Sequence, residues 1–416
     1  MGGSRYRRNL VIASGAATAI LFAAFDLYQW ALAYASDNFH NDLTFYYAAA
    51  KIGLTHGWQS IYDLRLQQEA LDALGSRIQI ADLARYISPP PVAWLAVPLT
   101  LLPFQVAFMV WSGLLLGALV WTWYLAAPGS GGLRLVHLAA ALGWLPVIYG
   151  LQLGQPELFV ALGVAGCYAL LRAGRPVWAG VALGAVVLKP QLAILVPAAL
   201  LVAGRYRAFG GSVLAIGLLA LAAVAVVGPA GVSAYEQRLN FAAGVPVNRE
   251  LTIAPLIGDL TAGRVVEAGI AIWSLILVYR FRRRQVEWVF VPALVGGLVA
   301  SPYLHLDDFL MLGLAAWLYL RTSPQPRWSW AFVLALVIAV EGIPFWGPLP
   351  AIAGELAALG LLSLLAAVPP SAVSETARPL PRLARGNDID TATELGSHRI
   401  LDAQRPLTLE ASPVGP

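Results

Sequence analysis

Residues 104–126 read FQVAFMVWSGLLLGALVWTWYLA, an apolar stretch without one charged side chain. A transmembrane helix needs about 20 consecutive, mainly apolar residues, because the hydrocarbon core of a bilayer is about 30 Å thick. The stretch meets that length, so it predicts a membrane-spanning helix. Similar segments lie on both sides of it along the chain.

The composition agrees with this prediction. Of the 416 residues, 59% are hydrophobic and only 12% are charged, whereas a soluble domain carries about 25% charged residues. A soluble protein could not bury so much apolar surface, but a bilayer can. The formal charge of +4 comes from basic residues in short turns, so it indicates membrane orientation and not nucleic-acid binding. The single cysteine, Cys167, excludes a disulfide within the chain.

The same length criterion predicts about twelve transmembrane helices, and therefore an all-α, polytopic membrane protein. The first apolar run is too long for the core of a secretory signal, so we expect it to be a helix of the mature chain. The two segments around Lys189 are the weakest and could form one broken, re-entrant hairpin. The predicted segments are 10–34, 104–126, 135–151, 156–172, 176–189, 190–204, 208–228, 261–281, 286–302, 306–320, 328–345 and 349–368.

These segments form one predicted transmembrane domain, residues 1–368. Residues 369–416 are rich in Pro, Ser, Thr, Arg and Asp, which predicts a disordered tail. Cytoplasmic loops carry an excess of Lys and Arg, so the basic residues near the N-terminus predict that both termini are cytoplasmic. The loops should then alternate between the cytoplasmic and the outer side along the chain. This alternation holds only if residues 89–102 lie at the membrane surface without crossing it. We expect a cytoplasmic-membrane protein whose partners include membrane lipids.

The first outward loop, residues 36–89, is the longest. It contains two amphipathic stretches near 42–56 and 63–75, which we expect to be juxtamembrane helices. The first of these stretches begins at an acidic residue, Asp42. Tyr46 lies one helical turn after Asp42 on the same helix face. A carboxylate at the bilayer surface can take a proton from a hydroxyl group. Asp42 is therefore a candidate catalytic base, and the alternative is an ordinary helix cap.

Two other outward segments carry candidate binding residues. Gln155 and Glu157 lie in the turn Gln152-Leu153-Gly154-Gln155-Pro156-Glu157 and could hydrogen-bond a sugar or a lipid headgroup, or simply cap the turn. Arg238 and Arg249 lie in the loop 229–260 and could hold a phosphate by forked hydrogen bonds. Surface loops commonly contain such residues.

Lys189 lies between apolar residues, and Pro190 follows it. A charge at the bilayer centre costs about 2.5–3.5 kcal/mol on insertion scales, so the ammonium group needs an anionic partner or a wet cavity. A phosphate would serve. The alternatives are an ion pair with an intramembrane acid, or a side chain that reaches the interface.

The last polar cluster is Ser301-Pro302-Tyr303-Leu304-His305-Leu306-Asp307-Asp308. His305 could act as a base or a hydrogen-bond donor, and Asp308 could orient it. The alternative is a satisfied histidine at the interface. One histidine beside two adjacent acids provides too few ligands in a fixed geometry, so we predict no metal site and no cofactor.

These stretches together resemble glycosyltransferase family 87, a family of the GT-C superfamily that includes polyprenol-phosphate-mannose-dependent mannosyltransferases. The resemblance extends over most of residues 10–345. It depends on the order and spacing of motifs that are individually unspecific: Asp42-x3-Tyr46-Tyr47, Ile61-Tyr62-Asp63, Ser88-Pro89-Pro90-Pro91, Gly154-Gln155-Pro156, Lys189-Pro190 and Ser301-Pro302 with His305.

The resemblance implies a GT-C-type bundle with an active site at the outer, periplasmic or exterior, membrane surface. It implies a polyprenyl-phosphate-linked sugar as donor, with mannose as the expected sugar, and a lipid or glycan acceptor. By the same comparison, Asp42 is the catalytic residue of an inverting transfer, Lys189 meets the donor phosphate, and His305 lines the sugar pocket. Tyr303 and Asp308, which lie beside His305, are further candidate substrate-binding residues. Glu157 stands where the family often has Asn, which puts the carried-over role of that turn in doubt.

A transporter or flippase of lipid-linked sugars is the main alternative. It would explain the many spans and the break at Lys189-Pro190. Transporters often have two related halves with broken helices at matching positions, and we find no such pairing here. A long outward loop also fits an enzyme better than a carrier. A non-catalytic scaffold for envelope assembly is the third hypothesis.

Overall fold

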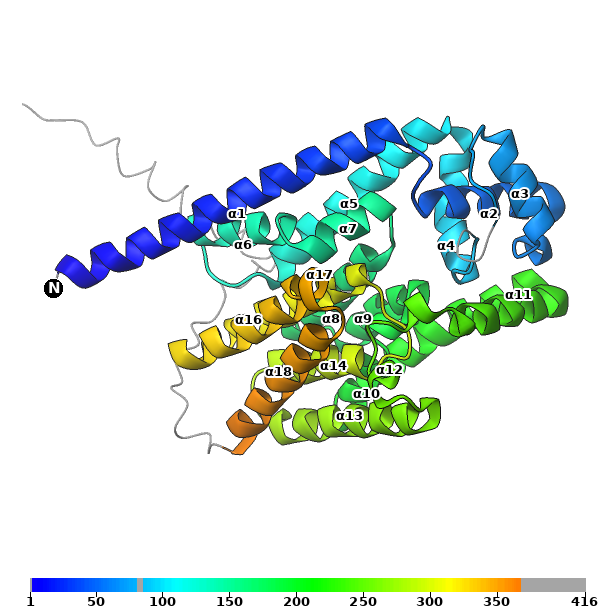
Figure 1. Ribbon diagram of the computed structural model, residues 1–416. Coiled ribbons are helices and arrows are strands. Elements are labelled where there is room, and N and C mark those ends of the chain that lie inside the picture. Colours follow the sequence, from blue (N-terminus) through cyan, green and yellow to red (C-terminus); the bar gives the residue numbers. More distant parts are fainter. Residues whose placement is uncertain (1, 81–84, 368–416) are drawn as a thin grey trace, which may run out of the picture. The chain divides into compact units, whose positions relative to one another are not determined.

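The computed structural model describes residues 2–80 and 85–367, and every regular element within these ranges is a helix (Figure 1). The α-helices are α1 (Gly2–Ser36), α2 (Leu43–His56), α3 (Leu64–Ala73), α4 (Pro90–Ala96), α5 (Phe104–Ala126), α6 (Gly132–Leu142), α7 (Leu145–Leu153), α8 (Glu157–Arg172), α9 (Pro176–Ala182), α10 (Leu195–Val202), α11 (Tyr206–Gly244), α12 (Ala254–Ile257), α13 (Leu260–Phe281), α14 (Glu287–Val299), α15 (Leu310–Arg321), α16 (Pro326–Glu341), α17 (Ile343–Trp346) and α18 (Leu349–Ala367). The 3-10 helices are η1 (Trp58–Ser60), η2 (Val97–Leu101), η3 (Leu183–Leu188), η4 (Pro190–Leu192), η5 (Pro246–Asn248) and η6 (Leu306–Phe309).

Within the described residues, five helices are long and apolar enough to cross a membrane, and six if the bent pair α6 and α7 forms one span. The five lie in α1, α5, α11, α13 and α18. The other predicted segments also contain helices, but these are shorter. The all-helical fold is therefore confirmed, and twelve spans stay a prediction.

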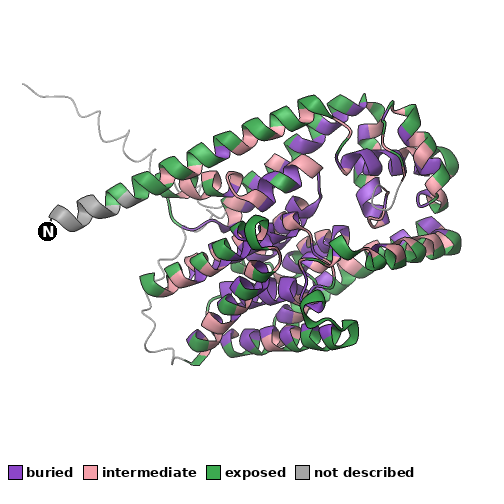
Figure 2. Ribbon diagram, in the orientation of Figure 1, coloured by how far each residue is buried: buried purple, intermediate pink, exposed green. Residues whose placement is uncertain are grey.

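Helix α14 shows why length alone does not decide the number of spans. Its 13 residues extend about 20 Å at 1.5 Å per residue, less than the thickness of the bilayer core. All of them are buried, and Figure 2 shows buried residues gathered in the middle of the helical bundle. A helix enclosed by other helices contacts protein instead of lipid, so its length need not match the bilayer.

The first loop forms the two helices that the sequence predicts, α2 and α3. Asp63 precedes α3, and its side chain accepts a hydrogen bond of 3.0 Å from the backbone N–H of Leu66, as an N-cap does. Residues 90–101 form α4 and η2, which are too short together to span a bilayer. The placement of this segment at the membrane surface stays a prediction.

Helix α11 connects the core to the first loop. Its 39 residues include a break at Gly228, where φ is +64°, directly before Pro229. Before the break it packs closely on α9, since a Cβ added at Gly180 would lie 2.0 Å from the carbonyl oxygen of Ala208. After the break it reaches the first loop, where the ring of Tyr235 stacks on that of Tyr62 at 4.9 Å. Figure 1 shows α2, α3 and α4 gathered near this end of α11.

Residues that the sequence places on the cytoplasmic side contact one another. Buried Glu287 pairs with Arg172 at 2.8 Å and lies 3.9 Å from Arg321. Arg321 also donates a hydrogen bond of 3.0 Å to the carbonyl oxygen of Ala127. The turns that contain Arg172, Glu287 and Arg321 and the end of α5 at Ala127 thus lie at one end of the bundle, as the predicted alternation of cytoplasmic and outward loops requires. The assignment of that end to the cytoplasm stays a prediction, and the tail 369–416 lies outside the described residues.

Candidate functional site

Asp42 meets the turn between α7 and α8, although the two are far apart in sequence. Its backbone N–H donates a hydrogen bond of 2.7 Å to the carbonyl oxygen of Leu153. Its carboxylate accepts a hydrogen bond from the side-chain N–H of Gln155. Asp42 does occupy the position before α2, but its side chain makes no capping hydrogen bond there. The carboxylate is therefore directed at the bundle, which the simple helix-cap alternative does not explain.

The surroundings of Asp42 change its acidity. Burial raises the pKa of its carboxyl to about 7, the nearby negative charge of Asp307 raises the pKa as well, and the ammonium group of Lys189 opposes both. A base with a pKa near the working pH can take up a proton and release it again. The electrostatics of this carboxylate suit general-base chemistry.

Tyr46 completes this part of the site. Its hydroxyl donates a hydrogen bond of 3.3 Å to the side-chain oxygen of Gln155, so Gln155 contacts both Asp42 and Tyr46. The turn itself is held by Trp111, whose indole N–H donates a hydrogen bond of 2.7 Å to the carbonyl oxygen of Gly154. Gly154 has φ +68°, which glycine adopts without strain. Asp42, Tyr46 and Gln155 thus lie together in the fold.

Lys189 lies in the break between η3 and η4 and is 8% exposed. Its ammonium nitrogen is 2.6 Å from a carboxylate oxygen of Asp307, 2.6 Å from one of Asp308 and 3.8 Å from one of Glu157. All three acids are fully buried. The ion-pair alternative from the sequence is therefore present, and phosphate binding by Lys189 stays an untested prediction.

His305 lies just before η6. Its ring nitrogen Nε2 is 2.9 Å from the side-chain oxygen of Asn248, and its ring is 4.9 Å from that of Tyr303. Asp308 accepts a hydrogen bond of 2.8 Å from the backbone N–H of His305. Asp308 thus orients the backbone of His305, whereas the ring is held by Asn248.

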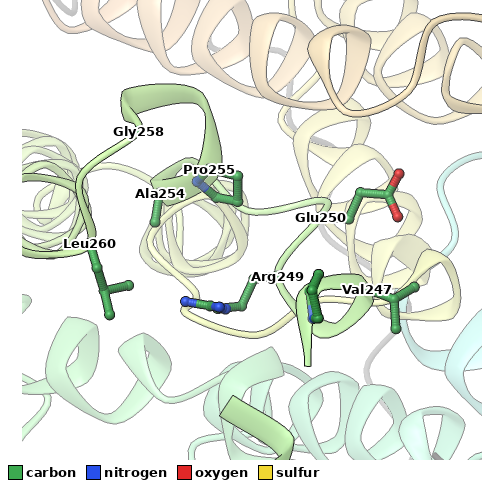
Figure 3. Close-up of a pocket in the computed structure, with 8 residues that line it drawn as sticks. Val247, Arg249, Glu250, Ala254, Pro255, Gly258 and Leu260 are labelled. Atoms are coloured by element: carbon green, nitrogen blue, oxygen red, sulfur yellow. The ribbon is translucent and has the colours of Figure 1, made fainter. Parts of the chain in front are cut away.

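Arg249 follows Asn248 and lines a pocket of about 630 Å³ between η5, α12 and the start of α13. Figure 3 shows its guanidinium group extending toward Leu260, whereas Glu250 points away. The Nε atom of Arg249 is buried and has no hydrogen-bond partner among the described residues. Arg238 lies elsewhere, in the second part of α11, and has no ion pair with a site residue in the part of the chain that the structure describes.

The sequence did not predict two residues that contribute to the site, Asn248 and Asp307. Asp307 had a signal, because a lysine within an apolar stretch needs a negative partner and a pair of adjacent acids lies near another such stretch. Asn248 had none, since its role depends on contact across the fold. No group of three or more His, Cys, Asp or Glu in the described residues could hold a metal ion, and the absence of a cofactor stays a prediction.

Comparison with protein families gives one match. Residues 86–344 match the model of glycosyltransferase family 87, which is more than half of the chain. The match contains Gln155, Glu157, Lys189 and His305 and begins after Asp42. No curated protein and no solved structure matches the chain. The resemblance seen in the sequence is confirmed: the chain belongs to glycosyltransferase family 87 and is a membrane glycosyltransferase.

Proposed function

We propose that this chain transfers a sugar, with mannose as the expected sugar, from a polyprenyl-phosphate donor to a lipid or glycan acceptor. The family supports the transfer of a sugar between lipid-linked substrates. The single observation that carries the proposal is the hydrogen bond from Gln155 to Asp42. It joins a carboxylate of raised pKa in the first loop to the part of the chain that matches the family.

The proposed reaction is a single displacement with inversion. A hydroxyl oxygen of the acceptor forms a bond to the anomeric carbon while the bond from that carbon to the donor phosphate oxygen breaks, and the phosphate leaves with the bonding electrons. Asp42 takes the hydroxyl proton, and His305 is the second candidate for this role. A phosphate held by cationic groups leaves without a general acid.

The donor phosphate is assigned to the pocket of Arg249. A guanidinium group presents two parallel N–H donors to phosphate oxygens, and the partner-free Nε of Arg249 is available for such a contact. Arg249 also adjoins Asn248, which holds His305. Arg238 is kept as a second phosphate ligand, because it lies on the part of α11 that meets the first loop.

The proposed reaction takes place at the outer face of the cytoplasmic membrane, with both termini in the cytoplasm. The contacts of Glu287 with Arg172 and Arg321 support this orientation, since they gather predicted cytoplasmic turns at one end. The first loop, with Asp42, then lies on the opposite side. Cysteine labelling from outside intact cells tests it: a cysteine placed at Asp72 on α3 reacts, and one placed at Arg205 does not.

Reconstitution tests the activity. The purified chain in liposomes receives a radiolabelled polyprenyl-phosphate mannose and a lipid acceptor fraction. Label in the acceptor supports the proposal, and loss of that transfer in Asp42→Asn assigns the base. Movement of labelled donor between leaflets without transfer supports the transporter instead, a function that the break between η3 and η4 also allows.

A further inference from the structure

Lys189 lies among three acidic side chains. Three carboxylates, those of Glu157, Asp307 and Asp308, lie within 4 Å of its one ammonium group, and the described residues add no arginine or second lysine to this cluster. An ammonium group has three N–H donors. One N–H donates a hydrogen bond of 2.6 Å to Asp307, while carboxylate oxygens of Asp308 and Glu157 lie 2.6 Å and 3.8 Å from the same nitrogen as ion-pair partners. A phosphate at this lysine would therefore meet an ammonium group that Asp307 and Asp308 already contact as ion-pair partners.

The same contacts determine where His305 lies. One oxygen of Asp308 is 2.6 Å from the ammonium nitrogen of Lys189, and the other accepts the backbone N–H of His305 at 2.8 Å. Asp308 thus links the lysine directly to the backbone of His305. The ring of His305 then reaches Asn248, next to the pocket of Arg249. A displaced Lys189 would change the alignment of His305 with that pocket.

We propose that Lys189 is a positioning residue that fixes the turn carrying His305 through Asp307 and Asp308, and that it does not bind the donor phosphate. The inference rests on the proposed function in so far as His305 lines the sugar pocket. The inference assigns two roles that both require a positive charge to two different residues. Lys189 stabilises the protein part of the site, and Arg249 binds the substrate.

Steady-state kinetics of Lys189→Met separates these roles. We expect kcat to fall about 100-fold, the loss that a displacement near 1 Å can cause, while the KM for the polyprenyl-phosphate donor stays unchanged. Arg249→Gln is the matched control, and we expect it to raise the donor KM. A raised donor KM with an unchanged kcat in Lys189→Met would overturn the inference.

A variant without the two close ion pairs is the second variant, because Lys189→Met alone leaves buried carboxylates without a counter-charge and can fail to fold. Lys189→Met combined with Asp307→Asn and Asp308→Asn removes both 2.6 Å ion pairs and leaves Glu157 as the one acid of the cluster, and an amide oxygen at position 308 can still accept the N–H of His305. We expect this triple variant to recover most of kcat. If it folds but binds polyprenyl phosphate more weakly than the wild type does, Lys189 is a phosphate ligand.

A stability measurement keeps the inference independent of the activity. Thermal unfolding in detergent is measured for Lys189→Met, for Asp307→Asn and for the pair, as a double-mutant cycle. We expect the pair to lose less stability than the sum of the single changes. Additive losses contradict the inference even if the enzyme transfers sugar, whereas absent transfer with a coupled cycle contradicts only the proposed function.

Discussion

Replacing Asp42 by Asn should abolish sugar transfer and at the same time make the protein more stable at neutral pH. The activity is lost because an amide takes no proton, and a general base contributes about 10²–10⁴-fold to a rate. The stability rises because burial makes the wild-type carboxyl costly to ionise, whereas an amide carries no charge. The amide keeps an oxygen that can accept the hydrogen bond from Gln155.

The size of the stability effect follows from the raised pKa. The pKa of Asp42 rises from 3.8 to about 7 on folding, and each unit corresponds to about 1.36 kcal/mol. The native state binds the proton more tightly, so the wild type loses stability as the pH rises from about 4 to about 7, by about 4 kcal/mol in total. Above that range the loss is constant. Between pH 5 and pH 8 the difference between variant and wild type should grow by about 2–3 kcal/mol.

Thermal unfolding in detergent at pH 5, 6, 7 and 8 measures this difference as an apparent Tm. The gap between Asp42→Asn and wild type should widen as the pH rises, and kcat/KM of the wild type should fall about tenfold per pH unit below about 7. Asp63→Asn is the matched control, since Asn also caps helices well; it should retain transfer. A constant Tm gap over this range, or transfer by Asp42→Asn at the native rate, would refute the reasoning.

Three other changes test the neighbouring contacts. Gln155→Leu removes the N–H donor whose hydrogen bond the Asp42 carboxylate accepts. The pKa of Asp42 should then rise, so we expect the acidic limb of the pH profile for kcat/KM to move to higher pH. An acidic limb at the wild-type pH would contradict a role of Gln155 in setting the pKa of Asp42. Arg249→Gln should weaken the binding of sugar-free polyprenyl phosphate at least tenfold in a filter-binding assay, because a charge-assisted hydrogen bond contributes about 1.5 kcal/mol or more. Equal binding by the variant and the wild type would exclude Arg249 as a phosphate ligand. Gly150→Ala places a Cβ 2.2 Å from a carboxylate oxygen of Glu157, so the apparent Tm should fall. Gly113→Ala is the control: open space surrounds Gly113 within α5, so this change should not lower the Tm, because Ala favours a helix more than Gly does.

The sequence predicts the long apolar helices well and the buried ones poorly. The predicted segment 104–126 has the bounds of α5, and 261–281 differs from α13 by one residue. By contrast, the segment 190–204 contains only η4 and the eight residues of α10. Hydropathy measures how a segment would partition into lipid, and both kinds of helix are apolar. It does not show whether the neighbour is lipid or another helix.

The site shows a similar division. Asp42, Lys189 and His305 could be selected from sequence because charged or titratable groups beside apolar segments need a specific environment. Their partners could not, since the hydrogen bond from Gln155 to Asp42 joins residues 113 positions apart. The contact between Lys189 and Asp307 spans 118 positions. The sequence offered phosphate, an acid or the interface as the partner of Lys189, and only the fold places the two aspartates there.

The turn from Leu153 to Glu157 explains how a residue outside the family match can serve the matched site. Its first residue accepts the backbone N–H of Asp42, and Gln155 donates to the carboxylate. Its last residue, Glu157, faces Lys189 in the cluster that positions His305. One short turn thus contacts both the proposed base and the cluster behind the proposed sugar pocket. The carbonyl oxygen of Asp42 in turn accepts hydrogen bonds from the backbone N–H groups of Phe45 and Tyr46 in α2, so the alignment of the base depends on the turn between α7 and α8 as well as on α2.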